Sequence, residues 1–377
     1  MKLKIFLLLP LLNLSNLFAF EVKGPARTEI GFRFQSVARN LETKSTQGTK
    51  KREENLYLSR ARVEVEVDWG NGFTQSLDIR NDDVNFEDKG VGNFELGNAY
   101  FKKVLNQGNF QHDFRVFKAK LDVSRTQTAS SARLLYLNRP HSSDFASNYI
   151  SQNRRSMNLQ WNGSYKKALT WHFVIGDGTN SNDFNDALGN SVDSISEKRL
   201  VYGSKLRAYL WGKKQKSLDE TFFNDDDFFS IGAGVFHQPR VIFKRGAQES
   251  TNDRTLANIE LTLNYGDIRL MAEYFSFSKV HPNFSNSLDA LGRGEAFYIQ
   301  SEVMLTKKLS SFLRYENWDR VKSEKAYELN NYVAGFNYYY LRNTIKFGIY
   351  GDHEVNGSAF TQERKITSVL LTSMLHF

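Results

Sequence analysis

The sequence of 377 residues has no cysteine, only five prolines and no long apolar run beyond its N-terminus. Without cysteine there can be no disulfide framework and no thiol chemistry. Few prolines are compatible with long strands, because proline cannot donate to a strand ladder. No later run approaches the roughly 18 apolar residues that a transmembrane helix needs, and the mean hydropathy is −0.50. These absences exclude a disulfide-stapled scaffold and a helical membrane protein.

The N-terminus has the pattern of a secretory signal. Two lysines precede an apolar run at 5–12, and Ala19 ends a stretch that is typical of a cleavage site. We therefore predict a cleaved signal peptide over residues 1–19 and one exported domain over 20–377.

Segments of about ten residues with alternating polarity follow, separated by alternately tight and long connections. Predicted tight turns lie at 69–72, 105–109, 161–163, 266–267, 306–308 and 341–343. Predicted long loops lie at 39–54, 82–92, 119–153, 177–196, 238–252, 280–293, 320–326 and 354–361. Predicted strands are centred near 33, 62, 77, 98, 114, 158, 172, 204, 232, 260, 272, 300, 314, 334, 348 and 371. The long connection 212–226 stands where a short turn is expected.

This pattern is typical of a membrane barrel. Aromatic residues make up 14% of the chain, as expected where aromatic girdles flank an apolar band. The last residues, 367–377, alternate in polarity and end on Phe377, as in a terminal barrel strand. We predict an all-β fold: a closed antiparallel transmembrane β-barrel of about sixteen strands, with short periplasmic turns and long external loops, in the outer membrane of a Gram-negative cell. A soluble periplasmic β-protein is the alternative fold.

Several predicted strands carry one charged face. Around residue 62, one face carries Tyr57, Ala61, Val63, Val65, Val67 and Trp69, and the other carries Arg60, Arg62, Glu64, Glu66 and Asp68. A charged face cannot point into lipid, so it must line water. The same alternation places these residues inside the barrel: Asp78, Arg80, Arg115, Arg269, Glu273, Glu302, Arg314, Glu316 and Lys346. These charges could line a path for ions, or they could only solvate the lumen and pair with one another.

The segment 115–155 concentrates positive charge. Its basic residues are Arg115, Lys118, Lys120, Arg125, Arg133, Arg139, Arg154 and Arg155. Against them stand only Asp122 and Asp144, so eight positive and two negative charges leave +6. Without Lys2 and Lys4, the whole chain has 48 basic and 42 acidic residues, also +6. A loop of this length is usually functional, and its charge favours anions.

Five stretches occur in an order that suggests a known family. They are ENLYLSRARV at 54–63; RVFKAK at 115–120 with Ser124, Ser130, Ser131, Leu135 and Arg139; IRLMAEYF at 268–275; RYENWD at 314–319; and AGFNYY at 334–339 with TIK at 344–346. The set resembles the phosphate-selective porins O and P over roughly 55–377. The resemblance implies a sixteen-stranded, homotrimeric porin whose inward-folded loop, about 119–153, forms a basic constriction.

Matched positions carry Arg60 and Arg62 over from the family's strand motif, and Lys120, Ser124, Arg125 and Arg139 from its constriction motif. Together with the basic residues of the long loop, the predicted anion path consists of Arg60, Arg62, Arg115, Lys118, Lys120, Ser124, Arg125, Arg133 and Arg139. The sequence departs from the family at Ser59, at 117–118 and at Asp122, and an acid beside the constriction weakens a phosphate preference more than a general anion preference.

We therefore predict a diffusion channel for small anions, with phosphate or polyphosphate as the finer expectation. The partners would be inorganic anions, the lipid bilayer, lipopolysaccharide and two further copies of the chain, with no nucleic acid. No nucleophile elbow, dinucleotide fingerprint or metal-ligand spacing is present, so we predict no enzyme, no metal and no cofactor. A general, weakly selective porin and a non-conducting structural or adhesive barrel remain the alternatives.

Overall fold

The computed structural model describes residues 27–44, 48–84, 94–129, 133–136, 138–151, 155–179, 194–212, 220, 227–280, 293–322, 325–342, 344–357 and 365–376, with the backbone alone for 82–84 and 365–376. The predicted signal peptide and the side-chain alternation predicted for 367–377 lie outside the described residues. So does most of the predicted loops 82–92, 177–196, 280–293 and 354–361.

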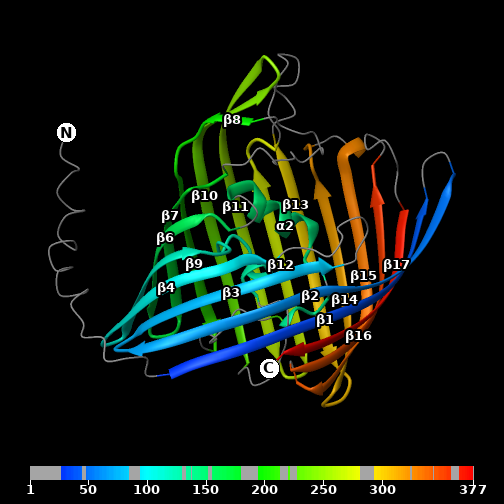
Figure 1. The fold of residues 1–377 in the computed structure, drawn as a ribbon, viewed down its shortest axis with the longest axis horizontal. Coiled ribbons are helices and arrows are strands. Elements are labelled where there is room, and N and C mark those ends of the chain that lie inside the picture. Colours follow the sequence, from blue (N-terminus) through cyan, green and yellow to red (C-terminus); the bar gives the residue numbers. More distant parts are fainter. Residues whose placement is uncertain are drawn as a thin grey trace.

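All strands belong to one antiparallel sheet (Figure 1). They are β1 (Arg27–Lys44), β2 (Lys50–Gly70), β3 (Phe73–Val84), β4 (Glu95–Gln107), β5 (Phe110–Lys118), β6 (Met157–Tyr165), β7 (Leu169–Gly176), β8 (Ser194–Glu197), β9 (Val201–Trp211), β10 (Phe228–Arg245), β11 (Gln248–Tyr265), β12 (Ile268–Phe277), β13 (Gly294–Met304), β14 (Leu309–Asp319), β15 (Glu328–Leu341), β16 (Ile345–Asn356) and β17 (Lys365–His376). The helices are α1 (Arg125–Thr128), α2 (His141–Ile150) and the 3-10 turn η6 (Lys325–Tyr327).

Sixteen of the seventeen strands follow one another along the sheet. Each pairs antiparallel with its neighbours in sequence, β9 pairs with β7, and β17 pairs with both β16 and β1. The short β8 is an addition that pairs with the outer end of β10. Each of the sixteen predicted strand centres lies within one of these strands, so the predicted all-β, antiparallel, sixteen-stranded architecture is confirmed.

The two faces of the sheet differ in polarity. On β11, the side chain of Ile259 is 59% exposed, whereas that of its neighbour Glu260 is 1% exposed. On β12, Arg269 and Glu273 are buried on one face, and Ile268 and Tyr274 are exposed on the other. The apolar exposed face is the outer one and the polar face is the inner one, as a strand between lipid and water requires. No helix of the described residues has the length and apolarity needed to cross a membrane.

Two predicted external loops are wrong, because the strands continue through them. β1 extends to Lys44 and β2 begins at Lys50. Likewise, β10 extends to Arg245 and β11 begins at Gln248. Most residues of these extensions are polar and suggested loops, although the β10 extension also contains the buried Val241 and Phe243. The backbone ladder needs no apolar face, however, and it continues into water.

One predicted tight turn is also wrong. Gly163 lies inside β6, and the turn comes later, at residues 166–168, where Lys166 and Lys167 have φ angles of 47° and 57°. Gly163 is required for a different reason. A Cβ atom there would lie 2.1 Å from Cε2 of Trp171, so the glycine lets that indole ring lie against the strand.

A β-bulge in β2 corrects the predicted position of Tyr57. Gln35 pairs with Arg60 and Ser36 pairs with Leu58, so Ser59 is the extra residue. One extra residue reverses the inner and outer sides of everything beyond it. Tyr57 therefore shares the inner face with Val37 and is buried there, although the unbroken alternation placed it outside.

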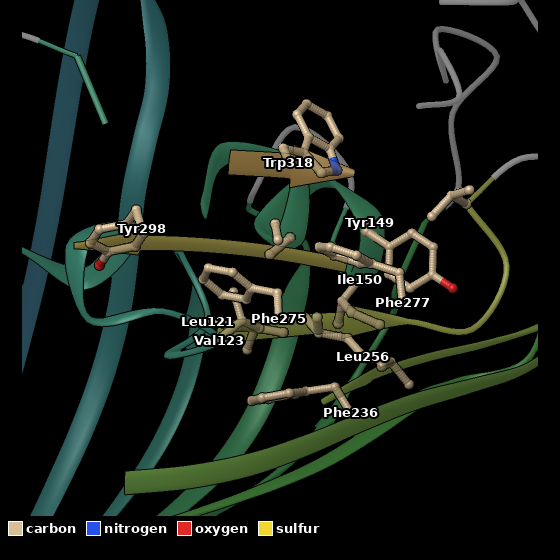
Figure 2. Packing of buried hydrophobic residues seen from close by; sticks show 14 of the residues in the cluster. Leu121, Val123, Tyr149, Ile150, Phe236, Leu256, Phe275, Phe277, Tyr298 and Trp318 are labelled. Atoms are coloured by element: carbon tan, nitrogen blue, oxygen red, sulfur yellow. The ribbon is translucent and has the colours of Figure 1, made fainter. Parts of the chain in front are cut away.

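The described residues between β5 and β6, within 119–156, lie against the inner face of the sheet, and we call them the inward segment (Figure 1). Its apolar residues, from Leu121 to Ile150, pack on the inner faces of β10–β14 (Figure 2). The ring of Tyr149 lies edge-on to that of Phe277, with centroids 5.4 Å apart. The main hydrophobic core therefore lies on the inner face of the sheet, between this segment and β10–β14.

Candidate ion path

The inner surface has a covered wall and an open wall. On the covered wall, β9–β16, inner residues such as Arg269, Glu302 and Glu316 are 0% exposed. On the open wall, β2–β5, charged inner residues such as Arg62 and Lys102 are partly exposed. Because permeating ions need water, the open wall and the adjacent side of the inward segment are the candidate path.

Side chains of the covered wall hold the inward segment largely through hydrogen bonds to its backbone carbonyl groups. Arg314 Nη1 donates to the carbonyl oxygen of Asn138 at 2.9 Å, and Lys346 Nζ donates to that of Leu134. Asn337 and Tyr350 both donate to the carbonyl of Leu135, at 3.1 Å each. Two cations that were predicted to line the lumen, Arg314 and Lys346, are therefore bonded to the inward segment.

A buried ion cluster anchors the beginning of the inward segment. The Asp122 carboxylate lies 3.2 Å from both Lys205 Nζ and Arg207 Nη2 on β9, and Glu260 on β11 binds the same two cations. Burial alone would raise the pKa of Asp122, but Lys205 and Arg207 outweigh it and lower the pKa. Two positive and two negative groups balance, so this cluster fixes the position of Asp122 against β9 and adds no net charge that would attract anions.

Three of the predicted path residues are committed within the inward segment. Ser124 and Arg125 are 0% exposed. Ser124 Oγ bonds to the hydroxyls of Thr126 and Ser143, and the Arg125 guanidinium lies 5.7 Å from the ring of Phe228. Neither side chain can touch a passing ion in this arrangement.

Arg139 has a similar role. Its Nε donates to the carbonyl of Thr126 at 2.6 Å and its Nη2 to that of Ala129 at 2.7 Å. These bonds tie the stretch before α2 to α1, so Arg139 braces the inward segment.

Lys118 falls on the outer side of the sheet. It shares a face of β5 with Phe114 and Val116, which are exposed outward, and it is the last residue of that strand. Because side chains alternate along a strand, Lys118 lies on the other face of β5 from Arg115 and Phe117. The prediction that Lys118 lines the path is therefore not supported by the register.

Arg115, Lys120 and Arg133 keep partial exposure. Arg115 lies on the inner face, where its Nε donates to both carboxylate oxygens of Asp113, at 2.9 and 2.8 Å. Lys120 lies two residues beyond the end of β5, at the start of the inward segment. Of these three, Arg115 has a neutralising partner two residues away.

A row of three arginines crosses from β1 onto the open wall. Arg33 of β1 pairs directly with Arg62 of β2, and Arg62 pairs directly with Arg80 of β3. Arg60 lies in the next row toward Tyr57. We call Arg33, Arg62 and Arg80 the arginine row. Periodicity identified Arg60, Arg62 and Arg80 as inner residues but missed Arg33, because the register that aligns it with the others depends on the bulge at Ser59.

Acidic residues flank the arginine row. Arg33 Nη2 lies 2.7 Å from Glu64 Oε1, and Arg80 Nη2 lies 3.3 Å from Glu95 Oε2. Arg62, in the middle, has an arginine on each side. The row is a local concentration of positive charge bordered by Glu64 and Glu95.

Two further residues at the inward segment could not be found from the sequence. His141 Nε2 lies 3.1 Å from Glu354 of β16; burial opposes its charge, but the carboxylate raises its pKa to about 9. Glu220, from the 212–226 connection, accepts a hydrogen bond at 3.0 Å from the backbone N–H of Leu135. Both contacts join residues far apart in sequence, and no local motif signals them.

Comparisons with known proteins agree on the fold. No family model matches the chain. An uncharacterized protein of Aquifex aeolicus is 22% identical over 326 residues, covering 78% of this chain and 74% of that protein. The anion-selective porin from Comamonas acidovorans superimposes with a TM-score of 0.58 at 13% identity, covering 93% of this chain and 99% of that one. The chain shares the fold of outer-membrane porins.

Two further solved structures extend this result. The outer-membrane channel DcaP of Acinetobacter baumannii gives a TM-score of 0.60 at 11% identity, covering 95% of this chain and 99% of that one. The trimer form of OmpT, an outer-membrane protein of Vibrio cholerae, gives a TM-score of 0.51 at 9% identity, covering 93% of this chain and 99% of that one.

Within the described residues, no group of three or more His, Cys, Asp or Glu could hold a metal ion.

Proposed function

We propose that this protein is a closed sixteen-stranded β-barrel of the outer membrane through which small anions diffuse. Pairing of β17 with both β16 and β1 supports closure, since every one of the sixteen strands then has two neighbours. Closure matters because an unpaired edge would leave backbone groups unsatisfied in lipid. The likeness to a porin and a channel supports conduction rather than enzymatic chemistry.

The arginine row is the observation that carries the anion preference. Like charges placed directly opposite each other in a sheet are destabilising, so three arginines in one row are a cost to the fold. Arg62 and Arg80 lie on the open wall, where Arg62 is partly exposed, and Arg33 lies beside them on β1 and is 3% exposed. A passing anion would relieve this repulsion, and guanidinium groups are well suited to replace part of the hydration shell of an oxyanion.

Phosphate or polyphosphate is the finer part of this proposal. With Ser124, Arg125 and Arg139 committed inside the inward segment, an oxyanion site would rest on Lys120 and on Arg60 and Arg62 of the open wall. Acidic partners favour the second candidate, a general porin with weak anion preference, because Arg33 lies 2.7 Å from Glu64 and Arg115 is paired with Asp113. We also propose that the protein is a homotrimer, in keeping with the trimer form of the Vibrio cholerae protein. It would be exported by a signal peptide, residues 1–19, that is then cleaved, and it would be surrounded by lipopolysaccharide.

A reversal-potential measurement tests the proposal. In planar bilayers under a chloride salt gradient, the wild-type channel is expected to be more permeable to anions. Arg62→Glu changes the charge by about two units at a position about 8 Å from the path, and it should lower the anion-to-cation permeability ratio about two- to fivefold. The matched control is Arg240→Glu, the same change at an exposed position at the outer end of β10. A cation-selective wild type would overturn the anion path, and an absence of current would favour a structural barrel.

A further inference from the structure

The longest helix of the described residues, α2, begins without a cap of its own. The first N–H groups of any helix lack partners inside the helix and need an acceptor. The residue at the N-cap position of α2 is Pro140, which has no side-chain acceptor and makes no capping bond. In isolation, therefore, this end of the helix would have to be satisfied by water.

Glu316 of β14 supplies the missing acceptor. Its Oε2 accepts from the backbone N–H of His141 at 2.9 Å, and its Oε1 accepts from the N–H of Ser142 at 2.7 Å and from the Ser142 hydroxyl. The Glu316 side chain is 0% exposed. A carboxylate at this end also interacts favourably with the positive end of the helix dipole. The cap of α2 thus comes from a strand more than 170 residues away.

β14 contacts the inward segment at three successive inner positions. Arg314 donates to the carbonyl of Asn138, Glu316 accepts from the start of α2, and the ring of Trp318 packs at 5.0 Å from that of Phe145. These three side chains lie two residues apart along β14, and they contact the inward segment in order, from residue 138 to residue 145. A single contact of the same kind lies on β12, where Glu273 accepts from the backbone N–H of Arg125 at 2.8 Å at the start of the four-residue α1.

We propose that Glu316 is the positioning residue of the constriction: it couples the formation of α2 to its docking on β14 and so holds the cross-section of the pore constant. This inference rests on the proposed channel function for its consequence, but the docking itself can be measured without conduction. Without the carboxylate, the start of α2 would lose its buried acceptor, and the inward segment would leave its docked position more often.

The test compares two buried wall glutamates. Glu316→Gln and Glu316→Ala are compared with Glu302→Gln, which removes the same charge from the covered wall. Glu302 is also 0% exposed, but its partners are the hydroxyls of Ser310 and Tyr339 on the wall, each at 2.6 Å. Hydrogen exchange of the amides in 141–150 is followed in refolded protein, together with single-channel current.

Glu316→Ala should speed exchange at the start of α2 at least tenfold, Glu316→Gln less, and Glu302→Gln under twofold. Open-channel current noise should likewise be highest in Glu316→Ala, lower in Glu316→Gln and lowest in Glu302→Gln. If Glu316 acted only as a charge in the lumen, Glu316→Gln and Glu302→Gln would instead shift ion selectivity equally. Unchanged exchange in Glu316→Ala, or an equal increase in Glu302→Gln, would overturn the positioning role. A silent wild type would overturn the channel proposal and leave the exchange result to decide the role of Glu316.

Discussion

The open wall and the covered wall are both lined by charged side chains, yet they use them differently. On the covered wall, Arg314 and Lys346 are bonded to backbone carbonyls of the inward segment, and Lys205 and Arg207 are balanced by two carboxylates. On the open wall, charges such as Arg62 stay partly exposed to the lumen. A charged strand face therefore shows that this face does not meet lipid, but it does not show whether its charges meet ions or hold a loop.

The largest expected effect comes from equal substitutions on the two walls. Glu260→Gln leaves Lys205 and Arg207 buried with Asp122 as their remaining carboxylate partner, and breaking a buried pair costs about 3–5 kcal/mol. Glu95→Gln on the open wall removes a partner of Arg80 from a carboxylate side chain that is 67% exposed, so the loss should stay below about 1 kcal/mol. Urea unfolding midpoints in lipid vesicles measure both. Equal losses would contradict the distinction between the walls.

Two arginines sharpen the same comparison. Arg314→Gln leaves the carbonyl of Asn138 without its donor and should lower the free energy of unfolding by about 1–3 kcal/mol, with little change in selectivity. Arg62→Gln should do the reverse: nearly unchanged unfolding, and an anion preference that falls about twofold for one lost charge near the path. Reversal potentials and unfolding curves on the same preparations decide it. A selectivity change in Arg314→Gln as large as in Arg62→Gln would place both arginines on the path.

Phosphate block is a smaller and more specific effect. Millimolar phosphate should partly block the chloride current, because tight binding slows exit through a narrow path. Lys120→Glu should remove the block. Arg125→Gln should leave it unchanged in folded channels, because Arg125 is 0% exposed, although the family resemblance placed both Lys120 and Arg125 in the constriction. Titration of chloride conductance with phosphate measures this, and loss of block in Arg125→Gln would show that the buried guanidinium reaches the ion.

The smallest expected effect is a dependence on alkaline pH. The raised pKa of His141, about 9, means that its pairing with Glu354 stabilises the fold fully below about pH 6.5, the ordinary value. This contribution falls as pH rises through 9, and it is modest because the side chain is 43% exposed. Unfolding midpoints of the wild type and His141→Asn should differ at pH 6 and converge above pH 9. A difference that persists at pH 10 would show that the imidazole acts through packing instead.

Local patterns were sufficient for most of the fold. The sixteen strands and their antiparallel order followed from alternation and from turn residues, because the side-chain period of a strand is local. The turn at 161–163 was misplaced because glycine serves both turns and close packing, and only the ring of Trp171 shows which applies at Gly163. The loops at 39–54 and 238–252 were misjudged because polarity reports contact with lipid, not the end of a ladder.

The candidate site was less predictable. The inner positions of Arg60, Arg62 and Arg80 could be predicted, but their alignment with Arg33 depends on one bulge residue, Ser59, and so does the inward position of Tyr57. Positive charge marked the inward segment, yet several of its basic residues turned out to brace the segment. Arg139 illustrates this, since its two backbone acceptors lie within the segment itself.

The sequence by itself determined the number and order of the sixteen strands, the side-chain alternation along most of them and where positive charge is concentrated. Only the tertiary structure decided which charges remain open to water, because that depends on where the inward segment docks. Docking is set by contacts such as those of Glu316 with the start of α2 and of Asp122 with β9, which join residues distant in sequence. No local period encodes such contacts, since they arise only when the sheet brings the two segments together.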